Sequence, residues 1–164
     1  MRLHVLDLVV LAAASGAALM AGAFFPFSSF VMGALGKLPP AQGIAAMQSI
    51  NLVVINPWFM STFIGTAALS LATSVTALVR WQEPGAAYLL GGSVLYFAGT
   101  FLVTMRFNVP RNNALAAVVP STTDAARLWA DYLVTWTAWN TVRTVAALAA
   151  MVAFVLAFRL QGTR

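Results

Sequence analysis

Residues 122–159 read TTDAARLWADYLVTWTAWNTVRTVAALAAMVAFVLAFR, a stretch that contains neither glycine nor proline. An uninterrupted helix over this range would be about 55 Å long at 1.5 Å per residue. The hydrocarbon core of a bilayer is only ~30 Å thick. The stretch therefore predicts a transmembrane helix over about residues 134–159, with an N-terminal part that projects beyond the bilayer or tilts strongly.

Three further segments are apolar enough and long enough to cross a bilayer, namely residues 6–35, 57–80 and 86–107. Asn56 and Pro57 form a typical N-cap and first-turn pair for the middle segment. Pro26 lies inside the first segment, where we expect a kink and a hydrogen bond from Ser28 or Ser29 to the freed carbonyl. The four segments predict an all-α fold, a four-transmembrane-helix bundle.

The composition agrees with a membrane protein. Hydrophobic residues make up 61% of the chain and charged residues 8%, whereas soluble domains carry about 25% charged residues. The net charge of +5 comes from basic residues scattered near the ends of apolar runs. This placement indicates contact with lipid headgroups in the bilayer, not with nucleic acid. One transmembrane domain over residues 1–164 is predicted.

Two connections, residues 36–56 and 108–120, are too long for simple turns, and we expect each to hold a short interfacial helix. With an even number of spans, both lie on one face with the projecting part of the long helix. Ser121 and Asp124 resemble a capping box at the start of that helix. The small residues 21–23 resemble a signal-peptide cleavage site, but the apolar run continues to Leu35, which predicts a retained first span.

Basic residues on the two faces are almost balanced. If the arginines on the face with the two long connections belong to a site, the remaining basic residues favour cytoplasmic termini. We therefore expect an integral protein of a bacterial inner membrane with its termini in the cytoplasm. The chain has no cysteine and one histidine. Disulfides, thiol nucleophiles and metal sites with several histidines are therefore excluded within one chain.

The long helix carries an unusual stripe of side chains. At 100° per residue, one face collects Trp129, Tyr132, Trp136, Trp139 and Arg143, with Asn140 at its margin. One interpretation is an aromatic belt at headgroup depth. However, the stripe rises ~21 Å along the axis, and an arginine within a span usually faces the bundle interior or a watery cavity. We favour an aromatic-walled pocket with one cation near its floor, which suits flat, partly anionic aromatic molecules.

A second polar group flanks the ends of the middle spans on the same face: Asn56, Arg106, Asn108 and Asn112. Each asparagine has the alternative role of a cap or turn former, and Arg106 that of a headgroup contact. Asn108 to Asn112 are expected to surround a helix start whose free N–H groups favour anions. Phe27 belongs to a phenylalanine collar in the first span, for which simple packing is the alternative.

Four segments occur in a recognisable order: FFPFS at residues 24–28, NPWF at 56–59, FNVPRNN at 107–113 and WTAWNTVR at 136–143. This pattern resembles the DUF1772 membrane family, which includes the fungal anthrone oxygenases, over nearly the whole chain. The resemblance implies an oxidoreductase that converts an anthrone, a polycyclic phenolic substrate, to an anthraquinone with O₂. It also implies a cofactor-independent monooxygenase, without flavin, haem or metal.

If the activity follows the resemblance, position along the helices predicts the site. Arg143 would stabilise the substrate oxyanion, while Asn140, Asn108 and Asn112 would hydrogen-bond oxygens. Stacking on the rings is predicted for Trp136, Trp139 and Tyr132. The remaining predicted substrate-binding residues are Trp129, Arg106, Asn56 and Phe27. The sequence identifies no general base.

Two other function classes stay open. The same pocket would serve a non-enzymatic membrane protein that binds or passes an apolar, quinone-like small molecule. Alternatively, the stripe would pack against a partner helix in a structural membrane subunit. Small residues in the third span, among them Gly91 and Gly92, suit close packing within the bundle or in a homo-oligomer. An ion channel is disfavoured, because the spans offer no ring of acids.

Overall fold

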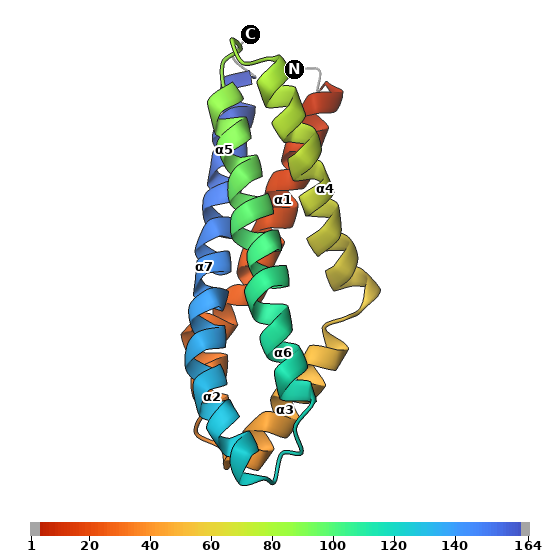
Figure 1. Ribbon diagram of the computed structural model, residues 1–164. Coiled ribbons are helices and arrows are strands. Elements are labelled where there is room, and N and C mark those ends of the chain that lie inside the picture. Colours follow the sequence, from red (N-terminus) through yellow and green to blue (C-terminus); the bar gives the residue numbers. More distant parts are fainter. Residues whose placement is uncertain (1–3, 162–164) are drawn as a thin grey trace.

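The computed structural model describes residues 4–161 and is all-α (Figure 1). The elements are α1 (Val5–Pro26), η1 (Phe27–Val31), α2 (Met32–Leu35), α3 (Pro40–Val53), α4 (Pro57–Val79), α5 (Ala86–Tyr96), η2 (Phe97–Leu102), η3 (Thr104–Asn108), α6 (Val109–Ala116) and α7 (Thr123–Gln161). The three η elements are π-helical segments. They continue the α-helices that flank them, so several elements join into longer helices.

Four of these continuous helices are long and apolar enough to cross a membrane: Val5–Leu35, Pro57–Val79, Ala86–Ala116 and Thr123–Gln161. The predicted four-helix bundle is thereby confirmed. The last of them has 39 residues and is about 58 Å long. It is therefore much longer than the ~30 Å hydrocarbon core of a bilayer.

The two ends of the bundle differ (Figure 1). The start of α1, the end of α7 and the turn from α4 to α5 lie together at one end, which we call the termini end. The other end, the cap end, holds α2, α3, α6 and the start of α7. The short helices α3 and α6 therefore share one end with the extended part of α7, as the even number of spans predicts.

Close helix packing in the bundle depends on small residues. A Cβ added at Gly99 would lie 2.6 Å from the Cβ of Ala146, and one at Gly92 would lie 3.0 Å from the Phe154 ring. These glycines bring the third span against α7. A Cβ at Gly16 of α1 would collide with the Thr66 side chain of α4. The pairs show the small-residue contacts that helix association in membranes favours.

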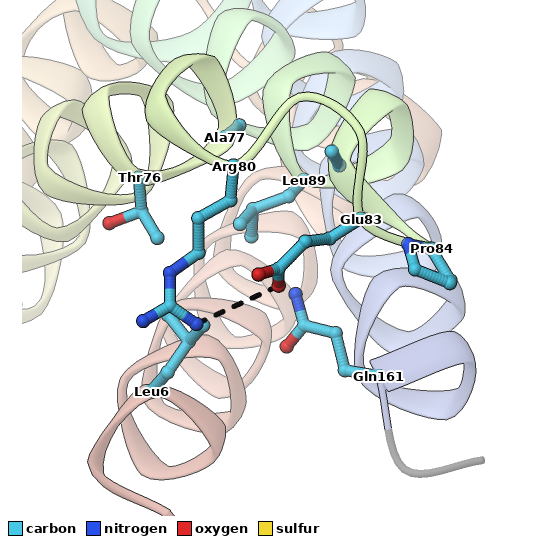
Figure 2. A pocket seen from close by; sticks show the side chains of 9 residues that line it. Leu6, Thr76, Ala77, Arg80, Glu83, Pro84, Leu89 and Gln161 are labelled. Carbon is cyan, nitrogen blue, oxygen red and sulfur yellow. Dashed lines mark ion pairs between the residues drawn. The ribbon is translucent and has the colours of Figure 1, made fainter. Parts of the chain in front are cut away.

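The termini end is closely packed (Figure 2). Arg80 and Glu83 form an ion pair with 3.7 Å between Nη1 and Oε2, and the Gln161 side chain lies beside Glu83. Gly85 takes a left-handed conformation with φ of 87° and starts α5. The cavity there has a volume of about 10 Å³, which is room for about one water molecule. This cavity, as residues 4–161 form it, is too small for an organic ligand.

The third span differs from its prediction. A helix end was expected at Phe107, with a new helix beginning near Pro110, but the helix continues through η3 into α6. Asn108 has α-helical φ and ψ of −80° and −44°, and the Val109 N–H donates to the carbonyl of Thr104. The predicted cluster of free N–H groups was therefore wrong. The side-chain amide of Asn108 donates instead to the carbonyl of Trp136 (3.2 Å), a tertiary contact that overrides the local preference for a turn.

Helix starts and the proline follow the sequence more closely. Asn56 caps α4 by accepting from the Phe59 N–H (3.1 Å). At α7, Thr122 is the cap that accepts from the Ala125 N–H (3.2 Å), so the cap residue is not Ser121. Behind Pro26 the helix becomes π-helical, and the Ser29 hydroxyl donates to the carbonyl of Phe25 (2.9 Å). This bond differs from the expected one, because the carbonyl that Pro26 leaves without its helical N–H partner is that of Gly22, four residues earlier.

Candidate functional site

A cavity of about 350 Å³ lies in the cap half of the bundle. Pockets for small molecules commonly have volumes of ~300–1,000 Å³. The lining is mostly apolar and comes from all four long helices and α3: Ala23, Phe24, Phe27, Met47, Ile50, Asn51, Val54, Ile55, Phe59, Met60, Phe63, Thr104, Met105, Val109, Asn112, Trp136 and Arg143. Two π-helical segments, η1 and η3, contribute to the wall, and π-bulges are frequent at functional sites.

Arg143 supplies the charge of this cavity. Its side chain is 7% exposed, and its Nη1 donates to the Thr104 hydroxyl (3.3 Å). The guanidinium carbon lies 4.0 Å from the centroid of the Phe24 ring and 5.1 Å from that of Trp136. Two aromatic faces therefore contact the cation, an arrangement that stabilises a desolvated guanidinium.

Asn140 orients the guanidinium. Its Oδ1 accepts from Nε (3.0 Å) and Nη2 (2.8 Å) of Arg143. Its Nδ2 donates to the carbonyl of Phe24 (2.8 Å) and to the Ser28 hydroxyl (2.7 Å). Asn140 is fully buried and does not line the cavity. It therefore joins α7 to the first span and fixes Arg143 from behind.

Within residues 4–161, Arg143 forms no ion pair with a carboxylate; the pair at the termini end is the one between Arg80 and Glu83. Buried charges in proteins are normally paired. Thr104 and Asn140 supply neutral hydrogen-bonding partners but no countercharge. An anionic group that entered the cavity would meet an unneutralised cation, so the cavity is suited to a flat ligand with a negatively charged oxygen.

A second polar cluster lies beside Trp136. The Oδ1 of Asn112 accepts from the Tyr132 hydroxyl (2.8 Å) and from the Trp136 indole N–H (2.7 Å). The Nδ2 of Asn51, from α3, donates to the Tyr132 oxygen (3.5 Å). Asn51, Asn112 and Trp136 line the cavity, whereas Tyr132 is buried behind them.

The structure thus brings together part of the predicted site. Arg143, Trp136, Asn112 and Phe27 line the cavity, and Phe27 packs edge-on against Trp136 with 5.8 Å between ring centroids. Asn108 is fully buried behind the wall. Its Oδ1 has no hydrogen-bond partner in the part of the chain that is described.

Five predicted binding residues do not line the cavity: Tyr132, which is buried behind Asn112 and Trp136, and Trp129, Trp139, Arg106 and Asn56. Trp129 is buried deeper in the cap end, stacked on Tyr132 with 5.6 Å between ring centroids. Trp139 stacks on Phe107 at 3.6 Å. Arg106 is exposed, and Asn56 serves as the cap of α4.

Burial argues against the aromatic-belt interpretation of the long helix. Trp129, Tyr132 and Trp136 are each at most 3% exposed. A belt requires these side chains to point outward into the headgroup layer. They point into the protein instead, and only Trp136 of the three reaches the cavity.

The contribution of α3 to the cavity was not predicted from the sequence. Met47, Ile50, Asn51 and Val54 line it, and their spacing of three, four and seven residues is that of one helix face. This signal is present in the sequence, but the segment was interpreted only as an interfacial connection. Thr104 was missed as well, although it lies four residues before Asn108 on the same helix face.

The described residues that line the cavity include no Asp, Glu or His. Among residues 4–161, no three His, Cys, Asp or Glu side chains come together as metal ligands do. The site can stack on a flat molecule, hold an anionic oxygen and donate neutral hydrogen bonds.

Comparison with known proteins gives a family match. The family model described as anthrone oxygenase matches residues 58–153, which is more than half of the chain. The matched range includes Asn112, Trp136, Asn140 and Arg143 but not Asn51. A search of curated proteins and a search of solved structures find no significant match.

Proposed function

This chain belongs to the anthrone oxygenase family, and we propose that it is a membrane-embedded oxygenase that oxidises an anthrone or a related polycyclic phenol with O₂. The observation that carries the proposal is the buried Arg143 guanidinium, which has no carboxylate partner in residues 4–161 and faces an apolar cavity. Such a group is suited to an oxyanion on a flat hydrophobic molecule. The family match supports the same substrate class.

Binding would use the walls of the cavity. Trp136 and Phe27 offer aromatic surfaces on which fused rings pack. Arg143 would hold the oxygen that becomes negatively charged when the substrate loses a proton. Because Asn140 already fixes the guanidinium, little reorganisation is needed when charge develops, which is the condition for strong electrostatic stabilisation.

The proposed chemistry needs few protein groups. Loss of a proton from the anthrone methylene gives an aromatic anion, which transfers one electron to O₂. The two radicals combine in a carbon–oxygen bond, and protonation gives a hydroperoxide. Loss of water then leaves a carbonyl, so that anthrone and O₂ give anthraquinone and water. In this proposal no flavin, haem or metal takes part, and the methylene proton passes to water because the cavity lining offers no carboxylate or imidazole.

One observation favours a second candidate, a membrane protein that binds or passes a quinone-like molecule without reaction. The same absence of an acid or base from the lining is what a non-catalytic binding site would show. This candidate shares the cavity and the ligand class, and differs in predicting no consumption of O₂.

The test is an oxygen-uptake assay with purified protein in lipid nanodiscs and an emodin-type anthrone. We expect one O₂ consumed per anthraquinone formed, above the uncatalysed rate, and no product under anaerobic conditions. Arg143→Ala is expected to lower kcat/KM by about 10²–10³-fold, the usual effect of removing an oxyanion-stabilising donor. Arg159→Ala, at the exposed far end of α7, is the control and should react like the wild type.

The outcomes separate the candidates. Equal rates for Arg143→Ala and the wild type would remove Arg143 from the site. Binding of the anthraquinone product without any O₂ uptake by the wild type would establish the non-catalytic candidate.

A further inference from the structure

We infer that the cavity recognises a second oxygen of its ligand, a neutral phenolic hydroxyl, through the side-chain amides of Asn112 and Asn51. This inference rests on the proposed function, because it concerns the same cavity. It assigns Asn51, which lies outside the family match at residues 58–153. It also gives Tyr132 a positioning role in place of the predicted ring stacking.

The orientation of the Asn112 amide follows from its partners. The indole nitrogen of Trp136 can only donate a hydrogen bond, so the Asn112 atom 2.7 Å from it must be the oxygen. The same oxygen also accepts from the Tyr132 hydroxyl. The Nδ2 of Asn112 is left without a partner in the part of the chain that is described, and Asn112 lines the cavity. Because the Trp136 indole and the Tyr132 hydroxyl both bond to the amide oxygen, the N–H groups of Asn112 are left available to a ligand.

The orientation of Asn51 follows by the same reasoning. A tyrosine hydroxyl has one hydrogen, and Tyr132 donates it to Asn112. The Asn51 atom that approaches the Tyr132 oxygen at 3.5 Å must then be the nitrogen. The Oδ1 of Asn51 remains an unused acceptor on a residue that lines the cavity.

A free donor on Asn112 and a free acceptor on Asn51 are linked through Tyr132, and both belong to the cavity lining. A phenolic hydroxyl both accepts and donates a hydrogen bond, so it satisfies both amides. A carbonyl oxygen would satisfy only Asn112. The pair is therefore suited to a hydroxyl in particular.

Trp136 connects this pair to the cation. Its indole nitrogen bonds to Asn112, while the centroid of the same ring lies 5.1 Å from the guanidinium carbon of Arg143. A fused ring system lying along Trp136 would reach Arg143 with one oxygen and the two asparagines with another. The ligand class is thus a polycyclic aromatic with an ionisable oxygen and a separate phenolic hydroxyl.

The experiment compares the dissociation constants of two probes that do not react with O₂: anthraquinone, and an anthraquinone with one hydroxyl on an outer ring. Binding is followed by quenching of tryptophan fluorescence in nanodiscs. We expect the wild type to bind the hydroxylated probe about 3- to 10-fold more tightly, as one net hydrogen bond contributes.

Asn112→Asp keeps an acceptor for Tyr132 and Trp136 but replaces the free N–H₂ with an oxygen that only accepts. The ligand hydroxyl can then only donate at this position, so the ratio of the two affinities should depart from the wild-type value. Tyr132→Phe removes the hydroxyl that orients both amides. It should reduce the affinity for the hydroxylated probe more than the affinity for unsubstituted anthraquinone. Asn113→Asp, an exposed neighbour, is the control and should retain the wild-type ratio.

Equal affinities in the wild type, or an unchanged ratio in Asn112→Asp, would overturn the inference even if anthrone is turned over. A ratio that responds to both variants would uphold it even if no O₂ is consumed. If neither probe binds the wild type, both the inference and the proposed cavity function are wrong.

Discussion

Asn140 uses every hydrogen-bonding position of its side-chain amide. Two donors of Arg143 meet its oxygen, while its nitrogen donates to Phe24 and Ser28. The amide therefore binds the cation without neutralising it. An aspartate at the same position would make nearly the same contacts to the guanidinium but would supply a full countercharge. The substitution also removes the bond that the Asn140 nitrogen donates to the carbonyl of Phe24, so stability must be measured together with activity to test whether the free charge of Arg143 matters.

Asn140→Asp is expected to lower kcat/KM for anthrone about 10- to 100-fold, because the new carboxylate competes with the substrate oxyanion for Arg143. The measurement is O₂ uptake in nanodiscs, with the thermal unfolding temperature recorded alongside. Thr141→Ser is a conservative control on the next position of α7. Undiminished activity in a folded Asn140→Asp protein would show that an unneutralised Arg143 is unnecessary.

Prediction from sequence succeeds at residues whose placement follows from one regular helix. Tyr132, Trp136 and Arg143 share a face of α7 because no glycine or proline disturbs its 3.6-residue repeat, and all three are buried. Trp139 was placed on the same stripe but stacks on Phe107 at 3.6 Å. The position of a residue around the helix axis predicts the direction of its side chain. Which ring that side chain contacts depends on the neighbouring helix.

At the scale of elements, the sequence predicts where the helices lie, but it does not predict that the third span continues through η3 into α6. The proline and asparagines near Asn108 favour a turn, yet the π-helical η3 carries the helix through. The contact that holds Asn108 in place is a bond to the carbonyl of Trp136, 28 residues away. Likewise, the spacing of Asn51 places it on one face of α3 with Met47 and Val54, but its approach to Tyr132 depends on how α3 folds back over the bundle.

The approach of α1 to α4 depends on Gly16. A Cβ at this position would collide with the side chain of Thr66, which is itself bonded to the carbonyl of Thr62 (2.7 Å). Gly22 lies on the same helix with no atom within 4 Å of an added Cβ. The two glycines therefore make a matched pair for measuring the packing of these helices.

Gly16→Val is expected to destabilise the protein by about 1–3 kcal/mol, the usual cost of overpacking, and to lower its thermal unfolding temperature in nanodiscs. Gly22→Val should leave that temperature nearly unchanged. Equal shifts for the two variants would show that α1 and α4 are not in close contact at Gly16.

At the scale of the whole molecule, α7 is about twice as long as the bilayer core is thick. Its N-terminal part belongs to the cap end with α3 and α6 (Figure 1). The sequence has no cysteine, so a single introduced thiol can report the depth of any position without interference from other thiols.

Ala130→Cys, exposed on the cap half of α7, is expected to react with a membrane-impermeant maleimide, whereas Val152→Cys, equally exposed on the protein surface, should be shielded by lipid. Gln82→Cys reports the termini end. With cytoplasmic termini, intact cells should label Ala130→Cys, while Gln82→Cys should require permeabilised cells. The reverse pattern would invert the orientation, and labelling of Val152→Cys would contradict the predicted membrane depth.

Two side chains of the cavity lining, Ile55 and Met105, are 69% and 49% exposed. Both are apolar, so the rim they form favours acyl chains over bulk water. A hydrophobic ligand would then enter laterally from the bilayer, into which it already partitions. The relevant ligand concentration would be that in the bilayer, in moles of ligand per mole of lipid. An apparent KM expressed per litre of solution would therefore rise when more lipid is added to the assay.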